Sequence, residues 1–179
     1  MELDFLLALQ QLHSPILDRV MVAITSLGNA GWLFIVIGIL LLCKKETRKS
    51  GLHVLIALLL SVIICNVFLK DLVARARPCW LMPEIELLIH LPTDYSFPSG
   101  HTSAAFAAAV TLYMRNKKFG ILMLVLAIFI AFSRMYLFVH FPTDVLGGAI
   151  TGTSSAVIAS GIVKKFEQRN KSYGNHKEI

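Results

Sequence analysis

Long apolar runs separated by short polar segments dominate the chain. A helix needs about 20 apolar residues to cross a bilayer, because the hydrocarbon core is about 30 Å thick and each residue rises about 1.5 Å. Five segments qualify, some only with their flanks: residues 27–43, 52–69, 101–114, 119–139 and 145–163. The pattern predicts an all-α integral membrane helical bundle with five clear transmembrane helices.

Residues 1–26 differ from these runs. The stretch LDFLLALQQLH is apolar on most of one side, and Ser14 and Pro15 then supply an N-cap and a first helical residue for a second helix. The second helix carries Asp18 and Arg19. We expect two short interfacial helices here, or a sixth span if they stack on the next segment.

Basic residues gather in three clusters, at residues 44–49, 115–118 and 164–171. All three fall on one side of the predicted bundle, and the positive-inside rule makes that side cytoplasmic. The opposite side then receives the N-terminus, the loop 71–98 and the turn at 140–144. We therefore expect a multi-pass protein of the cell (plasma) membrane with a cytoplasmic C-terminus.

The composition agrees with a membrane protein. Hydrophobic residues make up 56% of the chain and charged residues 16%, whereas soluble domains carry about 25% charged residues. The net charge is +6, but no nucleic-acid-binding motif accompanies it, so we expect no nucleic-acid partner. The three cysteines are scattered without a CxxC pair, which predicts neither a disulfide framework nor a thiolate metal site.

We expect a single domain of 179 residues. It would comprise interfacial helices at 1–26, a membrane core at 27–165 and a cytoplasmic tail at 166–179. The N-terminus has Glu2 and Asp4 where a secretory signal would carry basic residues, so we do not expect a cleaved signal peptide.

The first polar motif at a membrane edge is KDLVARARP, residues 70–78. Lys70 and Arg77 are seven residues apart, about two helical turns, so we expect them on one helix face that Pro78 then ends. Two cations on one face suit an oxyanion, since Arg forms a forked pair of bonds and Lys a point charge. A basic helix end at the lipid headgroups explains this segment equally well. We expect Arg75, off that face, to contact headgroups or solvent.

The second motif is FPSGHT, residues 97–102. Ser99 is a candidate N-cap, and Gly100 allows the backbone to approach a ligand closely. Exposed amides at a helix N-terminus form an anion site, and His101 lies in the first turn beside it. For Asp94 and Tyr95, just before the motif, we favour a loop role over a headgroup contact.

The third motif is SRMYLFVHFPTD, residues 133–144. It contains Arg134, His140 and Asp144. The spacing of four residues lets the carboxylate accept a hydrogen bond from one imidazole nitrogen, which leaves the other as a nucleophilic lone pair. A single histidine with an aspartate four residues later is more often a structural feature than a catalytic one. Together, however, the three motifs place three cations, a helix N-terminus and two histidines on one side of the membrane, an inventory that favours phosphoryl transfer.

KDLVARARP, PSGH and SRMYLFVHFPTD resemble, in residue type, spacing and order, the three signature motifs of the type-2 phosphatidic acid phosphatase superfamily. The resemblance covers about residues 50–165. The superfamily also includes soluble haloperoxidases, so the membrane character is predicted from the hydropathy of this chain.

The resemblance implies a role for each matching residue. His140 would attack phosphorus and form a phosphohistidine, Asp144 would orient it, and His101 would protonate the leaving oxygen and later activate a water. The phosphoryl oxygens would be held by Lys70, Arg77, Arg134, Ser99 and Gly100. It implies no metal and no other cofactor.

The resemblance further implies a metal-independent membrane lipid phosphatase. Small size and an outward site favour undecaprenyl diphosphate, by analogy with small bacterial relatives, with phosphatidylglycerophosphate and phosphatidate close behind. The expected partners are that lipid and the bilayer. Two alternatives stay open: a lipid-to-lipid phosphotransferase, and a non-enzymatic phospholipid-binding membrane protein.

A stripe of small residues recurs every four positions along the last apolar run: Gly148, Gly152, Ala156 and Ser160. Such stripes let helices approach closely. We assign this one to packing within a monomer rather than to a dimer interface.

Overall fold

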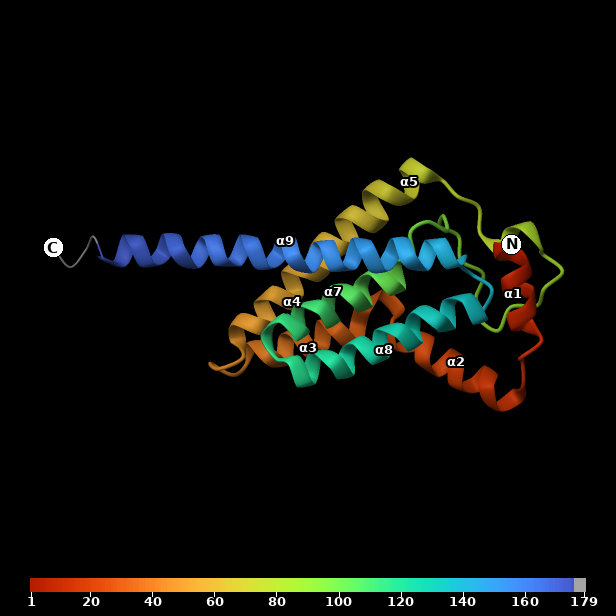
Figure 1. Cartoon of the computed structure of the whole chain (residues 1–179), viewed down its shortest axis with the longest axis horizontal. Helices are drawn as coiled ribbons and strands as arrows, with labels where there is room; N and C mark the ends of the chain where they lie inside the picture. The colour runs from red at the N-terminus through yellow and green to blue at the C-terminus, as the bar shows by residue number, and fades with distance from the viewer. Residues whose placement is uncertain (176–179) are drawn as a thin grey trace.

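The computed structural model describes residues 1–175, and the side chains of residues 1–166, 168 and 169. Throughout this part of the chain the regular elements are helices, which confirms the predicted all-α bundle (Figure 1). In chain order they are α1 (Glu2–Gln10), α2 (Pro15–Leu27), the 3-10 turn η1 (Asn29–Gly31), α3 (Trp32–Leu42), α4 (Arg48–Ser61), the π-helix η2 (Val62–Leu69), α5 (Lys70–Val73), α6 (Pro78–Leu81), α7 (Gly100–Arg115), α8 (Lys117–Tyr136) and α9 (Pro142–Asn175).

Helix α7 is the central element of the bundle. It packs against α8 and α9 along its length and also contacts α4. The contact with α9 is close because small residues face it. A Cβ on Gly152 would lie 2.2 Å from the carbonyl oxygen of Ser103, and one on Gly148 would lie 2.6 Å from that of Ser99. These two glycines of the predicted stripe thus pack within the chain.

Three helical segments of the described chain are long and apolar enough to cross a membrane: Arg48–Leu81, Lys117–Tyr136 and Pro142–Phe166. They contain the predicted spans at 52–69 and 145–163 and most of the one at 119–139. This makes the chain a multi-pass membrane protein, as expected from its hydropathy.

The other two predicted spans differ from simple transmembrane helices. Residues 27–43 correspond chiefly to α3, which continues α2 through a bend of 44°, so that the two helices together can form one span. Residues 101–114 lie in α7, whose 16 residues reach roughly 24 Å and fall short of the hydrocarbon core. Neighbouring helices α4, α8 and α9 pack against this helix and bury most of its small side chains.

The N-terminal segment forms the two predicted helices, and Ser14 caps the second one by accepting a hydrogen bond of 3.4 Å from Leu17 N. The two helices, α1 and α2, are placed differently relative to the bundle. Helix α2 leads into α3 through Ala30 and Gly31, whose φ angles are +50° and +67°. Helix α1 instead packs across one end of the bundle, where Leu6 and Leu9 are buried beside the chain that joins α8 to α9.

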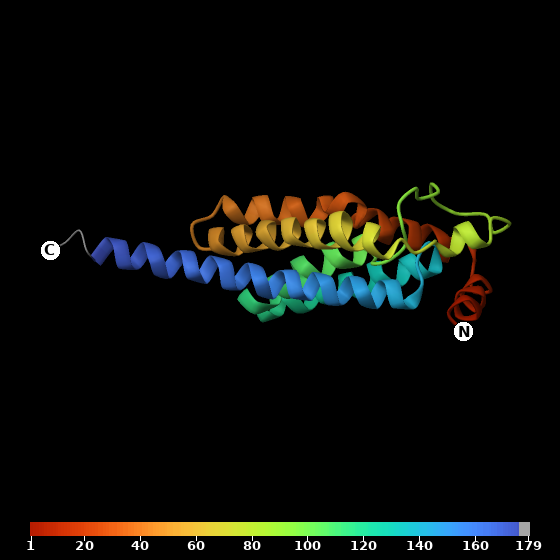
Figure 2. The same ribbon diagram turned by 90° about the horizontal axis from the view of Figure 1, so that it is seen from above.

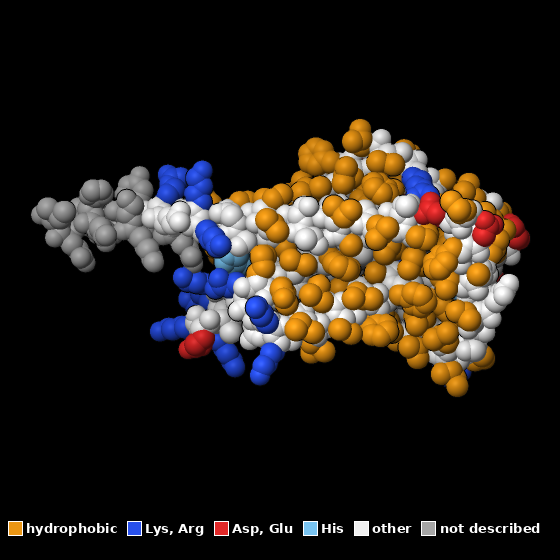
Figure 3. Space-filling model, viewed as in Figure 1, with side chains coloured by type: hydrophobic (Ala, Val, Ile, Leu, Met, Phe, Trp, Pro, Cys, Tyr) orange, Lys and Arg blue, Asp and Glu red, His pale blue; other side chains and the backbone are white. Residues whose placement is uncertain are grey.

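Charge is distributed unequally along the molecule. Lys and Arg side chains gather at one end, around the α3–α4 and α7–α8 connections and on α9, and an apolar band covers the middle (Figure 3). Helix α9 extends beyond the bundle at this basic end (Figure 2). Helix α9 continues unbroken to Asn175, so the last part of the predicted core and the first part of the predicted tail belong to one helix. Residues 176–179 of that tail lie outside the described residues.

Candidate active site

A cavity of about 1330 Å³ lies toward the end of the bundle that carries α1 and α5, away from the basic clusters. Its polar part is lined by five predicted site side chains: Lys70, Arg77, His101, Arg134 and His140. Gly100 also lines it. Apolar walls continue from there along α3, α4 and η2, with Ile35, Leu55, Leu58, Leu59 and Val62. The cavity can therefore hold a charged headgroup at one end and a lipid chain beyond it.

The first motif reaches the cavity by a route that the sequence does not predict. Lys70 follows the π-helix η2, and α5 ends only three residues later because Ala74 adopts a left-handed conformation (φ 48°). Arg77 is extended, as residues before proline prefer, and Pro78 begins a new short helix instead of ending one. The prediction that Lys70 and Arg77 share a helix face is therefore wrong, although both reach one cavity.

His140 lies in the turn between α8 and α9 and is almost fully buried. Its Nε2 is 3.1 Å from Arg77 Nη1, and its Nδ1 is 3.4 Å from Ser96 Oγ and 3.7 Å from Asp144 Oδ2. The last distance is too long for the predicted direct hydrogen bond. Ser96 instead joins the two residues, because its hydroxyl donates a hydrogen bond of 2.5 Å to Asp144 Oδ2.

The protonation of His140 follows from this environment. Burial lowers the pKa of the imidazole well below its usual value, and the positive charges of Arg77 and Arg134 lower it further. The ring is therefore neutral at pH 7. Arg77 donates toward Nε2, so the ring proton belongs on Nδ1, where the Ser96 hydroxyl can accept it. Nε2 then carries the lone pair.

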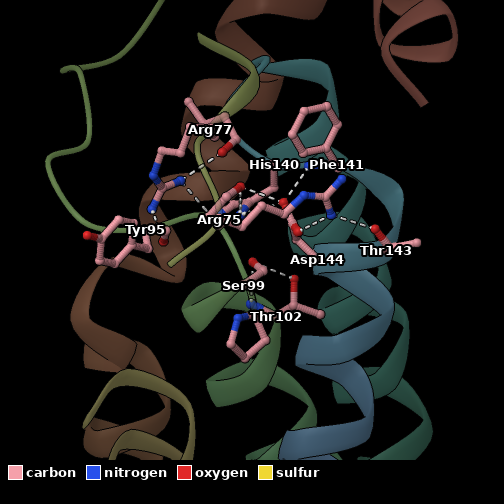
Figure 4. Close-up of polar contacts among 12 residues, drawn as sticks. Arg75, Arg77, Tyr95, Ser99, Thr102, His140, Phe141, Thr143 and Asp144 are labelled. Atoms are coloured by element: carbon pink, nitrogen blue, oxygen red, sulfur yellow. Dashed lines mark hydrogen bonds and ion pairs between the residues drawn. The ribbon is translucent and has the colours of Figure 1, made fainter. Parts of the chain in front are cut away.

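Arg75 pairs with Asp144, contrary to the prediction that it meets headgroups or solvent. Its Nη1 donates hydrogen bonds of 2.6 Å to Asp144 Oδ1 and 2.7 Å to Thr143 Oγ1, as Figure 4 shows. Its Nη2 donates one of 2.7 Å to Glu2 of α1. The guanidinium also lies over the Phe141 ring, 4.1 Å from its centroid. Arg75 thus fixes the carboxylate on the side away from His140 and ties α1 to the site.

Asp144 is completely buried at the start of α9. Besides Ser96 and Arg75, the amide of Phe141 donates a hydrogen bond of 2.8 Å to its Oδ2. Its carbonyl oxygen accepts a hydrogen bond of 3.0 Å from Ser99 N. These contacts connect the second and third motifs and give both carboxylate oxygens hydrogen-bond donors.

Arg134 reaches the cavity from α8. Its Nη1 donates a hydrogen bond of 2.7 Å to Thr25 Oγ1 of α2. Its Nε is the one buried side-chain nitrogen or oxygen without a hydrogen-bond partner among the described side chains. An unsatisfied buried donor costs about 1–3 kcal/mol, and more when charged. A phosphoryl oxygen in the cavity would satisfy it.

His101 and the second motif lie at the N-terminus of α7. The His101 Nε2 is 2.9 Å from Asn29 Oδ1. Because an amide oxygen only accepts, this contact places a proton on Nε2. Ser99 caps α7 as predicted, accepting hydrogen bonds from Thr102 N at 3.5 Å and Thr102 Oγ1 at 3.0 Å (Figure 4). Ser99 is fully buried, and its hydroxyl oxygen is the acceptor in both of these contacts.

Asp94 joins the site from the loop between α6 and α7, where we expected only a loop role. Its carboxylate accepts hydrogen bonds from Lys70 and Arg77 and lies on the cavity wall. Burial by itself would raise the pKa of Asp94, but the hydrogen bond from Lys70 and the charges of both cations outweigh it and lower the pKa to about 2. The carboxylate is therefore ionised at any working pH.

The chain matches known proteins over most of its length. The family model of the PAP2 superfamily matches residues 50–168. The chain belongs to the PAP2 superfamily. An undecaprenyl-diphosphatase from Sulfolobus acidocaldarius is 34% identical over 162 residues, which cover 87% of this chain and 78% of the relative.

Two solved structures share the fold of this PAP2 protein. The crystal structure of Aquifex aeolicus LpxE has a TM-score of 0.78 at 27% identity, covering 89% of this chain and 94% of that one. The crystal structure of a transmembrane PAP2-type phosphatidylglycerolphosphate phosphatase from Bacillus subtilis has a TM-score of 0.76 at 30% identity, covering 92% and 85%. The resemblance stated from the motifs is confirmed, and the PAP2 protein is a membrane lipid phosphatase, a phosphoric ester hydrolase.

Sequence reasoning missed three polar residues of the site: Arg75, Ser96 and Asp94. Arg75 lies inside the first motif, and this position is a sequence feature that could have indicated its place in the site. Ser96 and Asp94 lie just before the second motif, in a loop whose return to the cavity no periodic pattern reveals. Ser96 N donates a hydrogen bond of 2.9 Å to the carbonyl oxygen of Arg75, and this contact brings the loop back.

Proposed function

We propose that this PAP2 protein hydrolyses a polyprenyl diphosphate, with undecaprenyl diphosphate favoured over phosphatidylglycerophosphate and phosphatidate. The observation that carries the proposal is the single cavity in which Lys70, Arg77 and Arg134 meet His140 while apolar walls continue beyond them. One charged end with one apolar extension suits a lipid headgroup. The preference for the polyprenyl substrate rests on the name of the Sulfolobus acidocaldarius relative.

The site geometry supports a two-step reaction through His140. The Nε2 lone pair of His140 attacks the terminal phosphorus as the bond to the leaving oxygen breaks. His101, which carries a second proton on Nδ1 in the lipid complex, gives that proton to the leaving oxygen and becomes neutral. A phosphohistidine and a lipid monophosphate result. A water that loses its proton to His101 then attacks the phosphorus and breaks the P–N bond. Inorganic phosphate leaves, and both histidines return to their starting states.

The remaining residues stabilise charge and hold geometry. Arg134 Nε is unpaired, and Lys70 and Arg77 lie on the same cavity wall, so three cations can surround the phosphoryl oxygens. Ser96 and Asp144 hold the imidazole proton on Nδ1. The amides at Gly100 add donors at the start of α7. We propose no metal, because these cations supply the charge that a metal would otherwise provide.

The unequal charge distribution supports an orientation. The basic end of the bundle would face the cytoplasm, and the cavity would open on the extracytoplasmic side of the cell membrane. A cysteine introduced at Leu91, an exposed residue of the cavity loop, should react with an impermeant reagent on intact cells. Labelling only after the cells are lysed would contradict this orientation.

Two alternatives share parts of this site. A lipid-to-lipid phosphotransferase would use the same phosphohistidine but would pass phosphate to a second lipid. A non-enzymatic phospholipid-binding protein would use the cations but would need no nucleophile. The packing of Ser96, Asp144 and Arg75 behind His140 favours an enzyme, because it orients an imidazole that a binder would not require.

The test is phosphate release by the purified protein from a panel of lipids in detergent. Undecaprenyl diphosphate should be hydrolysed with the highest kcat/KM, vanadate should inhibit, and EDTA should have no effect. A phosphorylated lipid formed in place of free phosphate would support the phosphotransferase. Loss of activity in EDTA that Mg²⁺ restores would contradict metal-free catalysis.

A further inference from the structure

The carboxylate of Asp94 pairs with two of the cations that line the cavity, Lys70 and Arg77. Its Oδ1 accepts a hydrogen bond of 2.7 Å from Arg77 Nη2, and its Oδ2 accepts one from Lys70 Nζ. The Lys70 and Arg77 side chains are 6% and 3% exposed, whereas that of Asp94 is 57% exposed. Two buried cations thus hold a carboxylate that reaches them from a more open position.

The carboxylate leaves Arg77 without a free donor. A guanidinium has five N–H groups. On Arg77 they reach the carbonyl oxygens of Asp94, Val139 and Tyr95, the Nε2 of His140 and the Oδ1 of Asp94. A phosphoryl oxygen can bind Arg77 only by replacing one of these acceptors. Three are main-chain oxygens, and His140 Nε2 gives up its contact only when its lone pair attacks phosphorus. The Asp94 carboxylate is therefore the acceptor that leaves when a phosphate first binds.

The loop can stay in place when the carboxylate moves. Arg77 Nε donates a hydrogen bond of 2.7 Å to the Asp94 carbonyl oxygen, and Lys70 Nζ donates one of 2.8 Å to that of Tyr95. Trp80 Nε1 donates one of 3.0 Å to the carbonyl oxygen of Pro92. None of these contacts uses the Asp94 side chain. Rotation of that side chain toward solvent would therefore open the cation site while the main chain remains bound.

We propose that Asp94 is a built-in competitor for the phosphate site. Its carboxylate neutralises Lys70 and Arg77 in the empty enzyme, swings out when a lipid phosphate binds, and returns as inorganic phosphate leaves. The proposal rests on the proposed function only in taking these two cations as phosphate ligands. Such a competitor weakens the binding of every ligand of this site by the same factor, because only the fraction of molecules with the site vacant can bind.

The experiment compares the whole protein with Asp94→Asn and with Asp71→Asn, a matched change at an exposed acidic residue of α5. The probes are inorganic phosphate and methylenediphosphonate. Affinity is measured from the rise in unfolding temperature with ligand concentration, which requires no turnover. Asp94→Asn should bind both probes more tightly by the same factor, about tenfold or more. Asp71→Asn should match the unchanged protein.

Several results would overturn the proposal. Unchanged or weaker phosphate binding in Asp94→Asn is one of them. Another is a tightening that grows with the charge of the probe, occurs also in Asp71→Asn and disappears at about 0.5 M salt, because that result shows a long-range charge effect. If Asp94→Asn does not fold, Asp94→Ser makes the same test, since the main-chain contacts of the loop remain available.

Phosphate release from lipid, measured in parallel, separates this proposal from the proposed function. Tighter probe binding in Asp94→Asn without lipid hydrolysis by any of the proteins would contradict the proposed function and support the role of Asp94. Lipid hydrolysis with unchanged probe affinity in Asp94→Asn would support the proposed function and contradict the role of Asp94. Failure of all proteins to bind either probe would overturn the assignment of Lys70 and Arg77 and, with it, the role of Asp94.

Discussion

Arg75 Nη1 donates a hydrogen bond of 2.6 Å to Asp144 Oδ1, on the side of the carboxylate that faces away from His140. The other carboxylate oxygen is bound by Ser96 and lies 3.7 Å from His140 Nδ1. The acid that accompanies the proposed nucleophile is therefore held from two directions. Arg75 touches neither the cavity nor His140, so we expect it to act by positioning Asp144.

Replacement of Arg75 should slow chemistry more than it weakens binding. In Arg75→Gln we expect kcat to fall by about 10- to 100-fold, the loss of one hydrogen bond to a charged group, with KM changed little. Arg75→Lys should recover part of the loss. Steady-state kinetics on the best lipid of the panel measures both constants. Arg19→Gln, at an exposed arginine of α2, is the control. An equal loss of kcat in Arg19→Gln, or a pure KM effect in Arg75→Gln, would contradict the role of Arg75.

Ser96 should act between His140 and Asp144. Ser96→Ala removes the hydroxyl that joins them, so we expect kcat to fall by about tenfold or more while phosphate binding is retained. Ser96→Thr keeps the hydroxyl and should preserve more activity than Ser96→Ala. The measurement is kcat for all three proteins beside their affinity for inorganic phosphate. Full activity of Ser96→Ala would mean that His140 is oriented without this hydroxyl.

The environment of His140 predicts the pH profile. Burial, followed by the charges of Arg77 and Arg134, lowers the pKa of the imidazole below its usual 6.5 in the folded protein. A neutral ring is the nucleophile, so activity should persist as the pH falls to 6.5 and decline only below it. The acid limb of kcat/KM against pH measures this directly.

Arg77→Gln offers an internal check of that profile. Removing this charge should raise the pKa of His140 and move the acid limb to higher pH, besides lowering the rate. An acid limb above pH 6.5 in the unchanged protein, or a shift to lower pH in Arg77→Gln, would contradict the electrostatic account.

The packing of α9 on α7 gives a prediction about stability. A Cβ at Gly152 would lie 2.2 Å from the Ser103 carbonyl oxygen, whereas one at Gly161 meets nothing within 4 Å. Gly152→Ala should therefore destabilise the bundle by about 1–3 kcal/mol through overpacking. Gly161→Ala, on the same helix, should be neutral or slightly stabilising. Thermal unfolding in detergent compares them. Equal unfolding temperatures would refute the close approach of the two helices.

The sequence predicts much of this architecture because hydropathy and caps are local properties. The apolar runs locate α3, α4, α8 and α9, and Ser14 and Ser99 mark helix starts that the structure confirms. The same local properties do not show that α7 is enclosed by other helices. Its small residues fit the helical pattern, but how deeply they are enclosed depends on partners distant in the chain.

In the site, too, local sequence patterns do not reveal contacts between residues that are distant in the chain. Lys70 and Arg77 were expected to converge through helical periodicity, yet they converge through a turn at Ala74 and a contact with Asp94. The spacing of His140 and Asp144 predicted proximity but not the hydroxyl of Ser96 beside them. Residue types and order thus indicate the chemistry, whereas the loop that completes the site is defined only by long-range hydrogen bonds.

The central claim is that His140 accepts phosphate from the lipid. The most direct measurement is rapid quenching of the enzyme with undecaprenyl diphosphate labelled with ³²P in its terminal phosphate, followed by mapping of the labelled residue. We predict a protein-bound phosphate that is stable in base, labile in acid and located on His140. We further predict that His140→Ala forms none of it, releases no phosphate and still binds the lipid. Phosphate release by His140→Ala, or label on another residue, would contradict the account.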